Sequence, residues 1–184
     1  MNSQTHTTSI HSTTVLALAH NNSVVFAGDG QVTVSNTIMK HGATKIRSMR
    51  DGSVLAGFAG SAADSFALYE RFEGKLNEMT GHLGRAAVEL AKEWRADKYL
   101  RRLEAMLVVG DKESLYLLTG MGDVIEPDDG IIGIGSGGSF ALAAARALVR
   151  EASDKSAAEI ATASMRIAAE ICPFTNDRVH IEEL

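Results

Sequence analysis

The sequence predicts an α+β fold in a single domain, because runs of short strands alternate with runs of helices rather than with single helices. Hydrophobic residues alternate with period two near the N-terminus, change to helical spacing after about residue 61, and then repeat this order once. The 184 residues, of which 45% are hydrophobic and 22% charged, are enough to bury one core. Two sheets packed face to face between two helix pairs, a four-layer αββα sandwich, satisfy this order. Two open-faced α+β halves packed in another way satisfy it as well.

Residues 1–12 are predicted to be a short flexible leader, and residues 13–184 to be the domain. The leader MNSQTHTTSIHS contains no Lys or Arg and no apolar run, which argues against a signal peptide and an Arg-rich transit peptide. No apolar run in the chain approaches the ~20 residues that a membrane span needs. The single cysteine, Cys172, rules out an internal disulfide and fits a reducing compartment, so we expect a cytoplasmic protein.

Two hairpins are predicted after the leader. Aliphatic and β-branched residues fill their strands, and Asn-Asn and Asp-Gly pairs, which favour tight turns, separate them. The predicted strands are residues 13–20 and 23–28 of the first hairpin and residues 45–49 and 53–58 of the second. The N-terminal third is therefore expected to be antiparallel sheet.

Helices and a second set of strands follow. Hydrophobic residues recur at steps of three and four in two tandem helices, and again in two helices that close the chain. The predicted helices span residues 61–79, 81–102, 138–151 and 156–172, and the predicted strands between them span residues 105–110, 114–119, 123–126 and 130–135. Asp97 and Arg101 on the second helix are spaced to pair on a solvated face, to which we assign no chemistry.

The charge balance argues against nucleic acid as a partner. The chain has 18 Lys and Arg against 23 Asp and Glu, a formal charge of −5, and no basic arm. Proteins that bind nucleic acids need a basic surface to neutralise phosphates. His6 and His11 lack partners at the spacing of metal ligands, so we expect no zinc site.

Thr13 is the candidate nucleophile. A Thr-Thr pair that opens a strand is by itself an ordinary strand feature. Its position is more informative, because the junction between a flexible leader and a strand is easily cleaved and would hold a new N-terminus rigidly. A Thr hydroxyl needs a base, and the α-amine of an N-terminal Thr can be that base, whereas the amide nitrogen of an uncut chain has no basicity. Cleavage before Thr13 is therefore predicted to switch the activity on.

Two further motifs can assist such a nucleophile. Asp29, in AGDGQ, is placed to pair with a cation from the next hairpin, where Lys45 stands, although a plain turn and a surface lysine also fit. An ammonium near the new N-terminus would disfavour protonation of the α-amine and stabilise the alkoxide. In GFAGS, residues 57–61, glycine can leave an N–H free for an oxyanion, or Ser61 simply caps the following helix.

Two other patterns are weaker evidence for function. The segment GIGSGG, residues 133–138, matches the dinucleotide motif G-x-G-x-x-G, but another helix follows where a parallel strand is needed, so a close turn between strand and helix is the better interpretation. A nucleotide-binding module remains the alternative that this motif supports. Cys172 precedes Pro173 at the end of the last helix and is interpreted as a buried structural thiol rather than a nucleophile.

Several blocks occur in one order along the chain: TTVLALAHNNSVVFAGDGQVTVSNTIMKHGATKIR, VLAGFAGSAADSFALYERFEGKL, AAVELAKEWRADKYLRRLEAML and GIGSGGSFALAAARAL. Together they resemble the HslV (ClpQ) family, the proteasome-related peptidase subunits of bacterial ATP-dependent proteases. The resemblance runs from Thr13 to Leu184. It implies an N-terminal-nucleophile hydrolase with an αββα sandwich, in which members usually carry only an initiator Met or a very short leader. The twelve-residue leader departs from that pattern, so either the bond before Thr13 is processed or translation starts elsewhere.

The resemblance also implies the roles of individual residues. Thr13 would be the nucleophile, and Asp29 and Lys45 the pair that supports it. Gly57 would supply the oxyanion N–H, and Ser136 would stand near the nucleophile. The activity implied is that of a threonine endopeptidase that degrades unfolded proteins.

A cation and partners are implied in the same way. The family binds a monovalent cation, usually sodium, through carbonyl oxygens of a Gly-x-x-Cys-x-x-Thr stretch, which matches Ala169, Cys172 and Thr175 here, with alanine in place of the glycine. Subunits of the family form two stacked hexameric rings. Their partner is an HslU-type AAA+ ATPase hexamer that hydrolyses ATP and delivers unfolded substrate, so this chain is expected to bind no nucleotide. A ring scaffold or regulatory subunit of the same fold, which never exposes Thr13, is the alternative.

Overall fold

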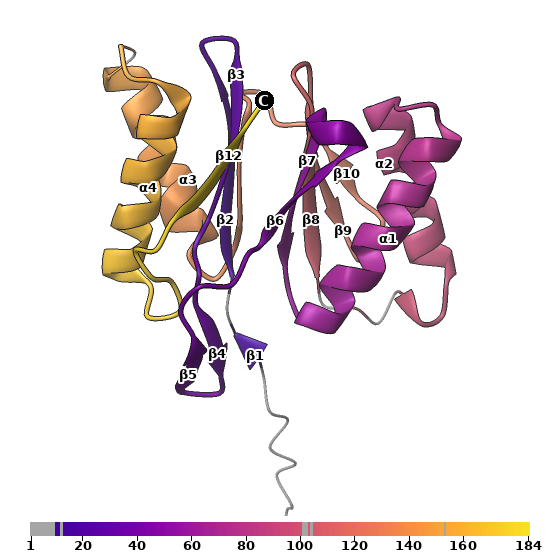
Figure 1. Cartoon of the computed structure of the whole chain (residues 1–184), viewed down its shortest axis with the longest axis horizontal. Helices are drawn as coiled ribbons and strands as arrows, with labels where there is room; N and C mark the ends of the chain where they lie inside the picture. Colours follow the sequence, from indigo (N-terminus) through magenta and orange to yellow (C-terminus); the bar gives the residue numbers. More distant parts are fainter. Residues whose placement is uncertain (1–9, 12, 101–102, 104, 153) are drawn as a thin grey trace, which may run out of the picture.

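The computed structural model describes residues 10–11, 13–100, 103, 105–152 and 154–184. They form four layers, with a pair of helices on each outer side and two sheets packed face to face between them (Figure 1). The predicted αββα sandwich is therefore confirmed, and the open-faced alternative is wrong. The helices are α1 (Ala62–Glu78), α2 (Leu83–Ala96), α3 (Gly138–Glu151) and α4 (Ala157–Ile171).

Both central sheets are antiparallel. One has the strand order β11-β2-β3-β12 and lies against α3 and α4, and the other has the order β10-β9-β8-β7-β6 and lies against α1 and α2. The first comprises β2 (Thr14–His20), β3 (Ser23–Gly28), β11 (Ile131–Gly135) and β12 (His180–Glu183). The second comprises β6 (Ile46–Met49), β7 (Val54–Ala59), β8 (Met106–Gly110), β9 (Leu115–Thr119) and β10 (Val124–Ile125).

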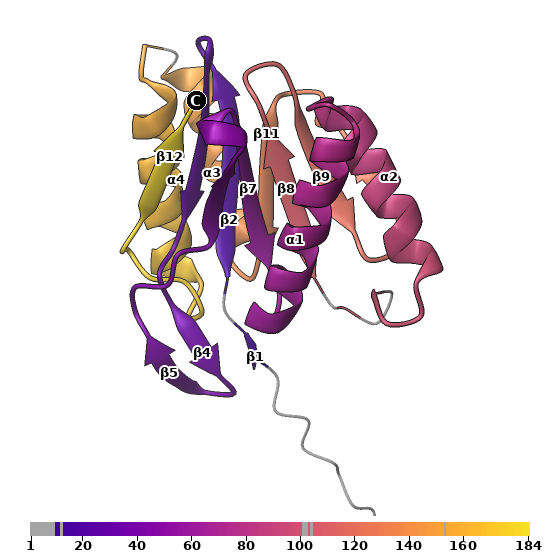
Figure 2. The same ribbon diagram turned by 45° about the vertical axis from the view of Figure 1, so that its right-hand side comes forward.

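A small third sheet lies at one end of the sandwich (Figure 2). It has the order β1-β4-β5 and comprises β1 (Ile10–His11), β4 (Val32–Val34) and β5 (Thr37–Lys40). Its strands were not predicted, because β5 is exposed along its whole length and the run is too short to show a clear alternation. Two residues of the leader that was predicted to be flexible thus form a strand.

The core explains why the strands of the first hairpin are hydrophobic without a break. Val15 and Ala17 of β2 pack into the space between the two sheets, and Leu16 and Leu18 pack against α3 and α4. A strand that is buried on both faces loses the polar half of its alternation. A third cluster, built around the fully buried Trp94, holds α1 and α2 on the second sheet.

Most predicted boundaries agree with the structure to within one or two residues, and two local features show why. Asn21 and Asn22 both adopt positive φ, at 51° and 62°, as the tight turn of the first hairpin requires. Ser61 caps α1, since its hydroxyl accepts from the N–H of Asp64 at 3.1 Å. Ser156 begins α4 in the same way, within a capping box.

The second predicted helix extends too far toward the C-terminus, since residues 97–100 are not part of α2. It ends at Ala96, where the carboxylate of Asp97 accepts hydrogen bonds from the N–H groups of Tyr99 and Leu100 and turns the chain out of the helix. The Asp97 carboxylate also lies 3.9 Å from Arg71 of α1. Arg101, its predicted partner, lies outside the described residues.

The last strand was also missed. β12 pairs with β3, which lies about the whole length of the domain away in sequence, with Ile181 opposite Ala27. Its own residues give no clear strand pattern, so the pairing comes from the tertiary structure. Of the described helices, none is long and apolar enough to span a membrane.

Candidate active site

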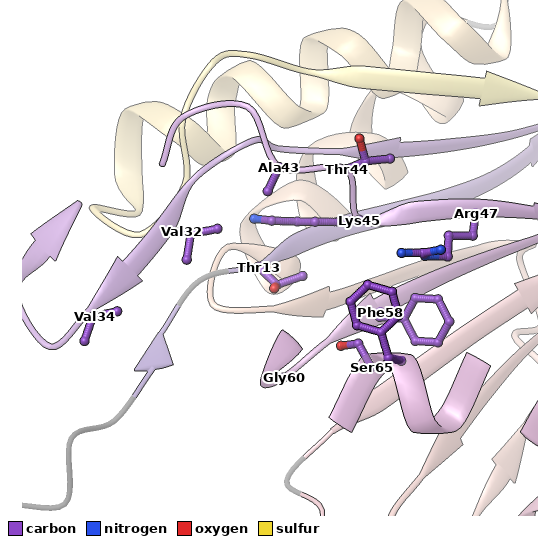
Figure 3. Close-up of a pocket in the computed structure, with 11 residues that line it drawn as sticks. Thr13, Val32, Val34, Ala43, Thr44, Lys45, Arg47, Phe58, Gly60 and Ser65 are labelled. Atoms are coloured by element: carbon purple, nitrogen blue, oxygen red, sulfur yellow. The ribbon is translucent and has the colours of Figure 1, made fainter. Parts of the chain in front are cut away.

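Thr13 directly precedes the first residue of β2 (Figure 3). Its carbonyl oxygen accepts a hydrogen bond from the N–H of Ser136 at 2.8 Å, and only 6% of the residue is exposed. The following Thr14 donates its main-chain N–H to Asp29 Oδ1 at 2.8 Å and accepts at its hydroxyl from the N–H of Gly137 at 2.9 Å. Residue 13 is therefore held in place by the chain on both sides of the strand end, as an N-terminal nucleophile requires.

Asp29 is fully buried, and its carboxylate accepts hydrogen bonds from several segments of the chain. Oδ1 accepts from Lys45 Nζ at 2.6 Å as well as from the N–H of Thr14. Oδ2 accepts from the main-chain N–H groups of Gln31, at 2.9 Å, and Asn176, at 3.4 Å. These four donors replace the water that burial removes from the carboxylate.

Lys45 confirms the predicted pairing with Asp29 and lies in the same pocket as Thr13 (Figure 3). Burial lowers the pKa of Lys45 from its ordinary value of 10.5, and the charge of Asp29 and the hydrogen bond to it offset part of that effect. A charge that is fixed in a poorly solvated site acts on its neighbours more strongly than the same charge in water. The ammonium can therefore influence the protonation of groups on Thr13.

A pocket of about 190 Å³ opens beside Thr13. Its walls are mainly apolar, with the polar groups of Thr13, Lys45 and Ser65 at the lining. Arg47 lies at one side with its guanidinium 4.4 Å from the ring centre of Phe66, a cation–π contact (Figure 3). The lining residues are Thr13, Val32, Val34, Ala43, Thr44, Lys45, Arg47, Phe58, Gly60, Ser65 and Phe66. The pocket has the size and character to receive one apolar side chain next to the hydroxyl of Thr13.

The structure separates two glycines of the GFAGS segment. Gly57 lies inside β7, where a Cβ would be 2.6 Å from Val15 Cγ1, so its glycine is explained by close packing of the two sheets. It does not line the pocket, whereas Gly60, one residue beyond the end of the strand, does. The role that the resemblance implies for Gly57 stays a prediction, and Gly60 is the glycine of this segment that lines the pocket.

The GIGSGG segment is a close turn between β11 and α3, as the preferred interpretation had it. A Cβ on Gly133 would lie 2.2 Å from the carbonyl oxygen of Gly138, so the strand and helix touch through their backbones. The N–H of Gly137, at the start of α3, is used by Thr14. Ser136 is exposed, and its N–H bond to Thr13 brings it next to the candidate nucleophile. Two N–H groups of the turn, those of Ser136 and Gly137, are therefore used at the Thr13 strand end.

The stretch Ala169, Cys172 and Thr175 lies where α4 ends. In a helix the carbonyl of Ala169 would accept from the N–H of residue 173, but Pro173 has none. Carbonyl oxygens at the last turn of a helix carry partial negative charge, which suits a cation. Alanine at position 169 does not remove the main-chain oxygen, and the Cys172 carbonyl accepts one hydrogen bond, from the N–H of Thr175 at 3.1 Å, so the cation site stays a prediction. The Thr175 hydroxyl lies 2.7 Å from that of Thr14, so the stretch borders the Thr13 strand end.

The described part of the leader, β1, pairs with β4, which contributes to the pocket wall. Ile10 of β1 pairs with Val34 of β4, and His11 pairs with Thr33. Val34 is one of the residues that line the pocket. Residues 1–9 and 12 lie outside the described residues, so cleavage before Thr13 remains a prediction.

Two polar residues of this site were missed from the sequence. Gln31 donates from its side chain to the Thr33 hydroxyl and to the carbonyl of Pro173, each at 2.9 Å. Asn176 donates its main-chain N–H to Asp29 and bonds three main-chain groups with its side chain. Both connect segments far apart in the sequence, and no local pattern marks such residues.

Three comparisons place the chain among known proteins. A family model described as "Proteasome subunit" matches residues 10–184. The chain is 63% identical over 175 residues to the ATP-dependent protease subunit HslV of Brevibacillus brevis, covering 95% of this chain and 97% of that protein. It is 61% identical over 176 residues to the protein of the same name from Geobacillus sp., covering 95% and 98%. The crystal structure of eukaryotic HslV from Trypanosoma brucei superposes with a TM-score of 0.89 at 47% identity, over 93% of this chain and 98% of that one.

Proposed function

Because the chain belongs to the proteasome subunit family, we propose that it is the threonine peptidase subunit of an ATP-dependent protease, with Thr13 as its nucleophile. The observation that carries the proposal is the buried Asp29–Lys45 pair, in which Lys45 lines the same pocket as Thr13. A buried ion pair is costly to desolvate, and a silent ring scaffold has no use for one at this place. The peptidase is therefore favoured over the scaffold.

The chemistry begins with a free α-amine on Thr13. In the processed chain the amine takes the proton of the Thr13 hydroxyl as the oxygen attacks the peptide carbonyl of the substrate. The amine then gives that proton to the leaving nitrogen, and an ester on Thr13 remains. Water activated by the same amine hydrolyses the ester and releases the second product. The general-base step contributes about 10²–10⁴-fold, so an uncut chain is expected to be nearly inert.

Lys45 and Asp29 support these steps without touching the scissile bond. The ammonium disfavours protonation of the α-amine, so that more of the amine is present as the free base, and it stabilises the developing alkoxide. Asp29 fixes the ammonium and, through the N–H of Thr14, the strand end that carries the nucleophile. The N–H of Gly60, with that of Gly57 as the alternative, is the donor to the oxyanion, and Ser136 stands beside Thr13, to whose carbonyl oxygen it donates its N–H.

A sodium ion belongs to the proposal as well. The carbonyl oxygens of Ala169, Cys172 and Thr175 would hold it, at the end of α4 and next to the Thr14–Thr175 hydroxyl contact. Its charge would stiffen the α4–β12 connector. We assign no step of the reaction to it.

The names of the relatives, which are subunits of ATP-dependent proteases, support a partner that uses ATP, and the stoichiometry is part of the proposal. The proposed form is two stacked hexameric rings of this chain, capped by an HslU-type AAA+ ATPase hexamer that unfolds protein substrates. ATP hydrolysis is assigned to that partner, since in the GIGSGG turn of this chain the N–H of Gly137 donates to the Thr14 hydroxyl. The proposed location is the cytoplasm.

Intact mass and covalent labelling of the nucleophile together test the proposal. The active preparation is expected to consist of chains that begin at Thr13, and a peptide epoxide or vinyl sulfone is expected to modify Thr13 and no other residue. Thr13→Ala should assemble as the unaltered chain does and hydrolyse no peptide. A fully active preparation that retains Met1, or a Thr13→Ala variant with full activity, would contradict the mechanism.

A further inference from the structure

Asn176 lies in the connector between α4 and β12, where two other connectors of the chain meet it. Its side-chain Oδ1 accepts from the N–H of Gly30 at 3.1 Å and from that of Arg178 at 3.2 Å. Its Nδ2 donates to the carbonyl oxygen of His41 at 3.1 Å. Both ends of the amide are therefore used, and the partners fix which end is oxygen and which is nitrogen.

The two connectors that the amide joins carry the supporting pair of the proposed nucleophile. Gly30 follows Asp29, and His41 precedes Lys45 by four residues in an irregular segment. The connectors also touch directly, since Ala43 donates its N–H to the carbonyl of Gly30 at 2.9 Å. A Cβ on Gly30 would lie 2.2 Å from the carbonyl oxygen of His41. A shift of either connector would therefore move Asp29 and Lys45 relative to each other.

Asn176 has a second link to the same pair, through its own backbone. Its main-chain N–H donates to Asp29 Oδ2 at 3.4 Å. The residue thus contacts Asp29, the segment after Asp29 and the segment before Lys45. A neutral amide does this without adding a second negative charge beside Asp29, and its Nδ2 supplies the donor that a carboxylate lacks.

We propose that Asn176 is a positioning residue of the peptidase, whose side chain clamps the Gly30 and His41 connectors so that Asp29 and Lys45 stay in register beside Thr13. It acts through these residues and does not touch the substrate. The inference rests on the threonine-peptidase function proposed above. It assigns a role in turnover to the connector after α4, which the pocket does not include.

Asn176→Ala removes the clamp and leaves the main-chain N–H to Asp29 in place. The kcat for a fluorogenic peptide is expected to fall on the order of 10- to 100-fold, because small displacements of reacting groups have effects of this size. KM should change by less than about threefold, because no contact to substrate is lost. All variants should be produced so that Thr13 is the first residue, which removes any effect on processing, and assayed in the complex with the ATPase.

Asp111→Ala is the matched control. The Asp111 carboxylate accepts from the N–H groups of Glu113 and Ser114, so this change also removes a side-chain acceptor from two main-chain donors, but in a turn between β8 and β9. It should lower the melting temperature by an amount comparable to Asn176→Ala and leave kcat unchanged. If Asp111→Ala lowers kcat equally, or if Asn176→Ala keeps the kcat of the unaltered chain, the proposal is wrong.

Asn176→Asp separates the two halves of the clamp and decides the matter if the alanine variant does not fold. The carboxylate keeps an acceptor for Gly30 and Arg178 but cannot donate to His41. Turnover should fall while the thermal transition stays cooperative, and an unaltered kcat would overturn the role of the His41 bond. Failure of the peptidase function itself would look different, since the unaltered chain with a free Thr13 would then be inactive.

Discussion

Lys45 and Lys75 both pair with carboxylates, but their surroundings shift their pKa values in opposite directions. Lys45 is buried against Asp29, and burial lowers its pKa. Lys75 of α1 lies on the surface, where hydrogen bonds to Glu78 and to Glu93 of α2 raise its pKa. An exposed pair keeps most of its water, so the attraction is the main effect, whereas a buried ammonium loses its water first. A lysine paired with a carboxylate is therefore a surface contact in one region and a buried group with a lowered pKa in the other.

The network around Lys75 has the features of a surface contact between helices. Arg71 also bonds Glu93, and Asp97 at the end of α2 lies within 3.9 Å of Arg71. Trp94 and Phe72, fully buried beneath, supply the apolar contacts between this helix pair and the sheet. The helix pair is thus held by its core, and the ion pairs on its surface add little.

Asp29→Asn is expected to have the largest effect. It removes the counter-charge that the structure records for Lys45 and leaves an ammonium in a buried site, which typically costs about 3–5 kcal/mol of unfolding free energy. Urea unfolding of the variant measures the loss, and peptide hydrolysis should fall with it. An unfolding free energy equal to that of the unaltered chain would show that the Lys45 ammonium is adequately solvated without Asp29.

Lys45→Met is expected to affect turnover more than stability. The methionine fills a similar volume, and Asp29 keeps three main-chain N–H donors, so the cost in unfolding free energy should be smaller than for Asp29→Asn. Loss of the positive charge beside Thr13 should lower kcat by about 100-fold or more. Steady-state kinetics of the assembled variant gives the answer, and near-normal kcat would remove Lys45 from its role.

The pH dependence should differ in sign between the two lysines. The folded-state pKa of Lys45 lies below that of the unfolded chain, so in the window between them the unfolded chain binds more protons and the contribution of Lys45 to stability rises with pH. Turnover should fall in that same window, below pH 10.5, as the ammonium is lost. The raised pKa of Lys75 gives a contribution that is complete below its unfolded value and is lost as pH rises through the folded value.

Unfolding free energies of the unaltered chain, Lys45→Met and Lys75→Met between about pH 8 and about pH 11 test this contrast. The difference between the unaltered chain and each variant isolates the lysine concerned. Difference curves with the same slope for both positions would contradict it.

Glu93→Gln is expected to have the smallest effect. It breaks the pairs with Arg71 and Lys75 on the surface and leaves the core beneath untouched. Turnover should be unchanged. The melting temperature should fall only slightly, and the fall should be smaller still in high salt, which screens exposed charges. A large loss of stability would show that the network holds the helices together, and the distinction between the two regions would fail.

Some residues of the candidate site could be predicted from the sequence, and others could not. Thr13, Asp29 and Lys45 could be predicted because each sits at the junction of predicted elements, and the structure brings them together. Gly57 could not be told from Gly60, since both glycines occur in one short segment and only the packing against Val15 separates them. The end of α2 was misplaced, because helical spacing continues past Asp97 while its side chain binds the backbone instead.

By itself the sequence determined the four helices, the other strands of the two central sheets, the tight turns and the residues that could act as nucleophile and supporting pair. These depend on local periodicity, on side-chain conformational preference and on chemical type, which are properties of neighbouring residues. The tertiary structure decided that β12 completes a sheet with β3, that Lys45 is buried and its pKa lowered, and that Asn176 reaches the connectors of Gly30 and His41. Burial and contacts between distant segments arise only when the layers pack against each other, so they cannot be predicted from any single stretch of the sequence.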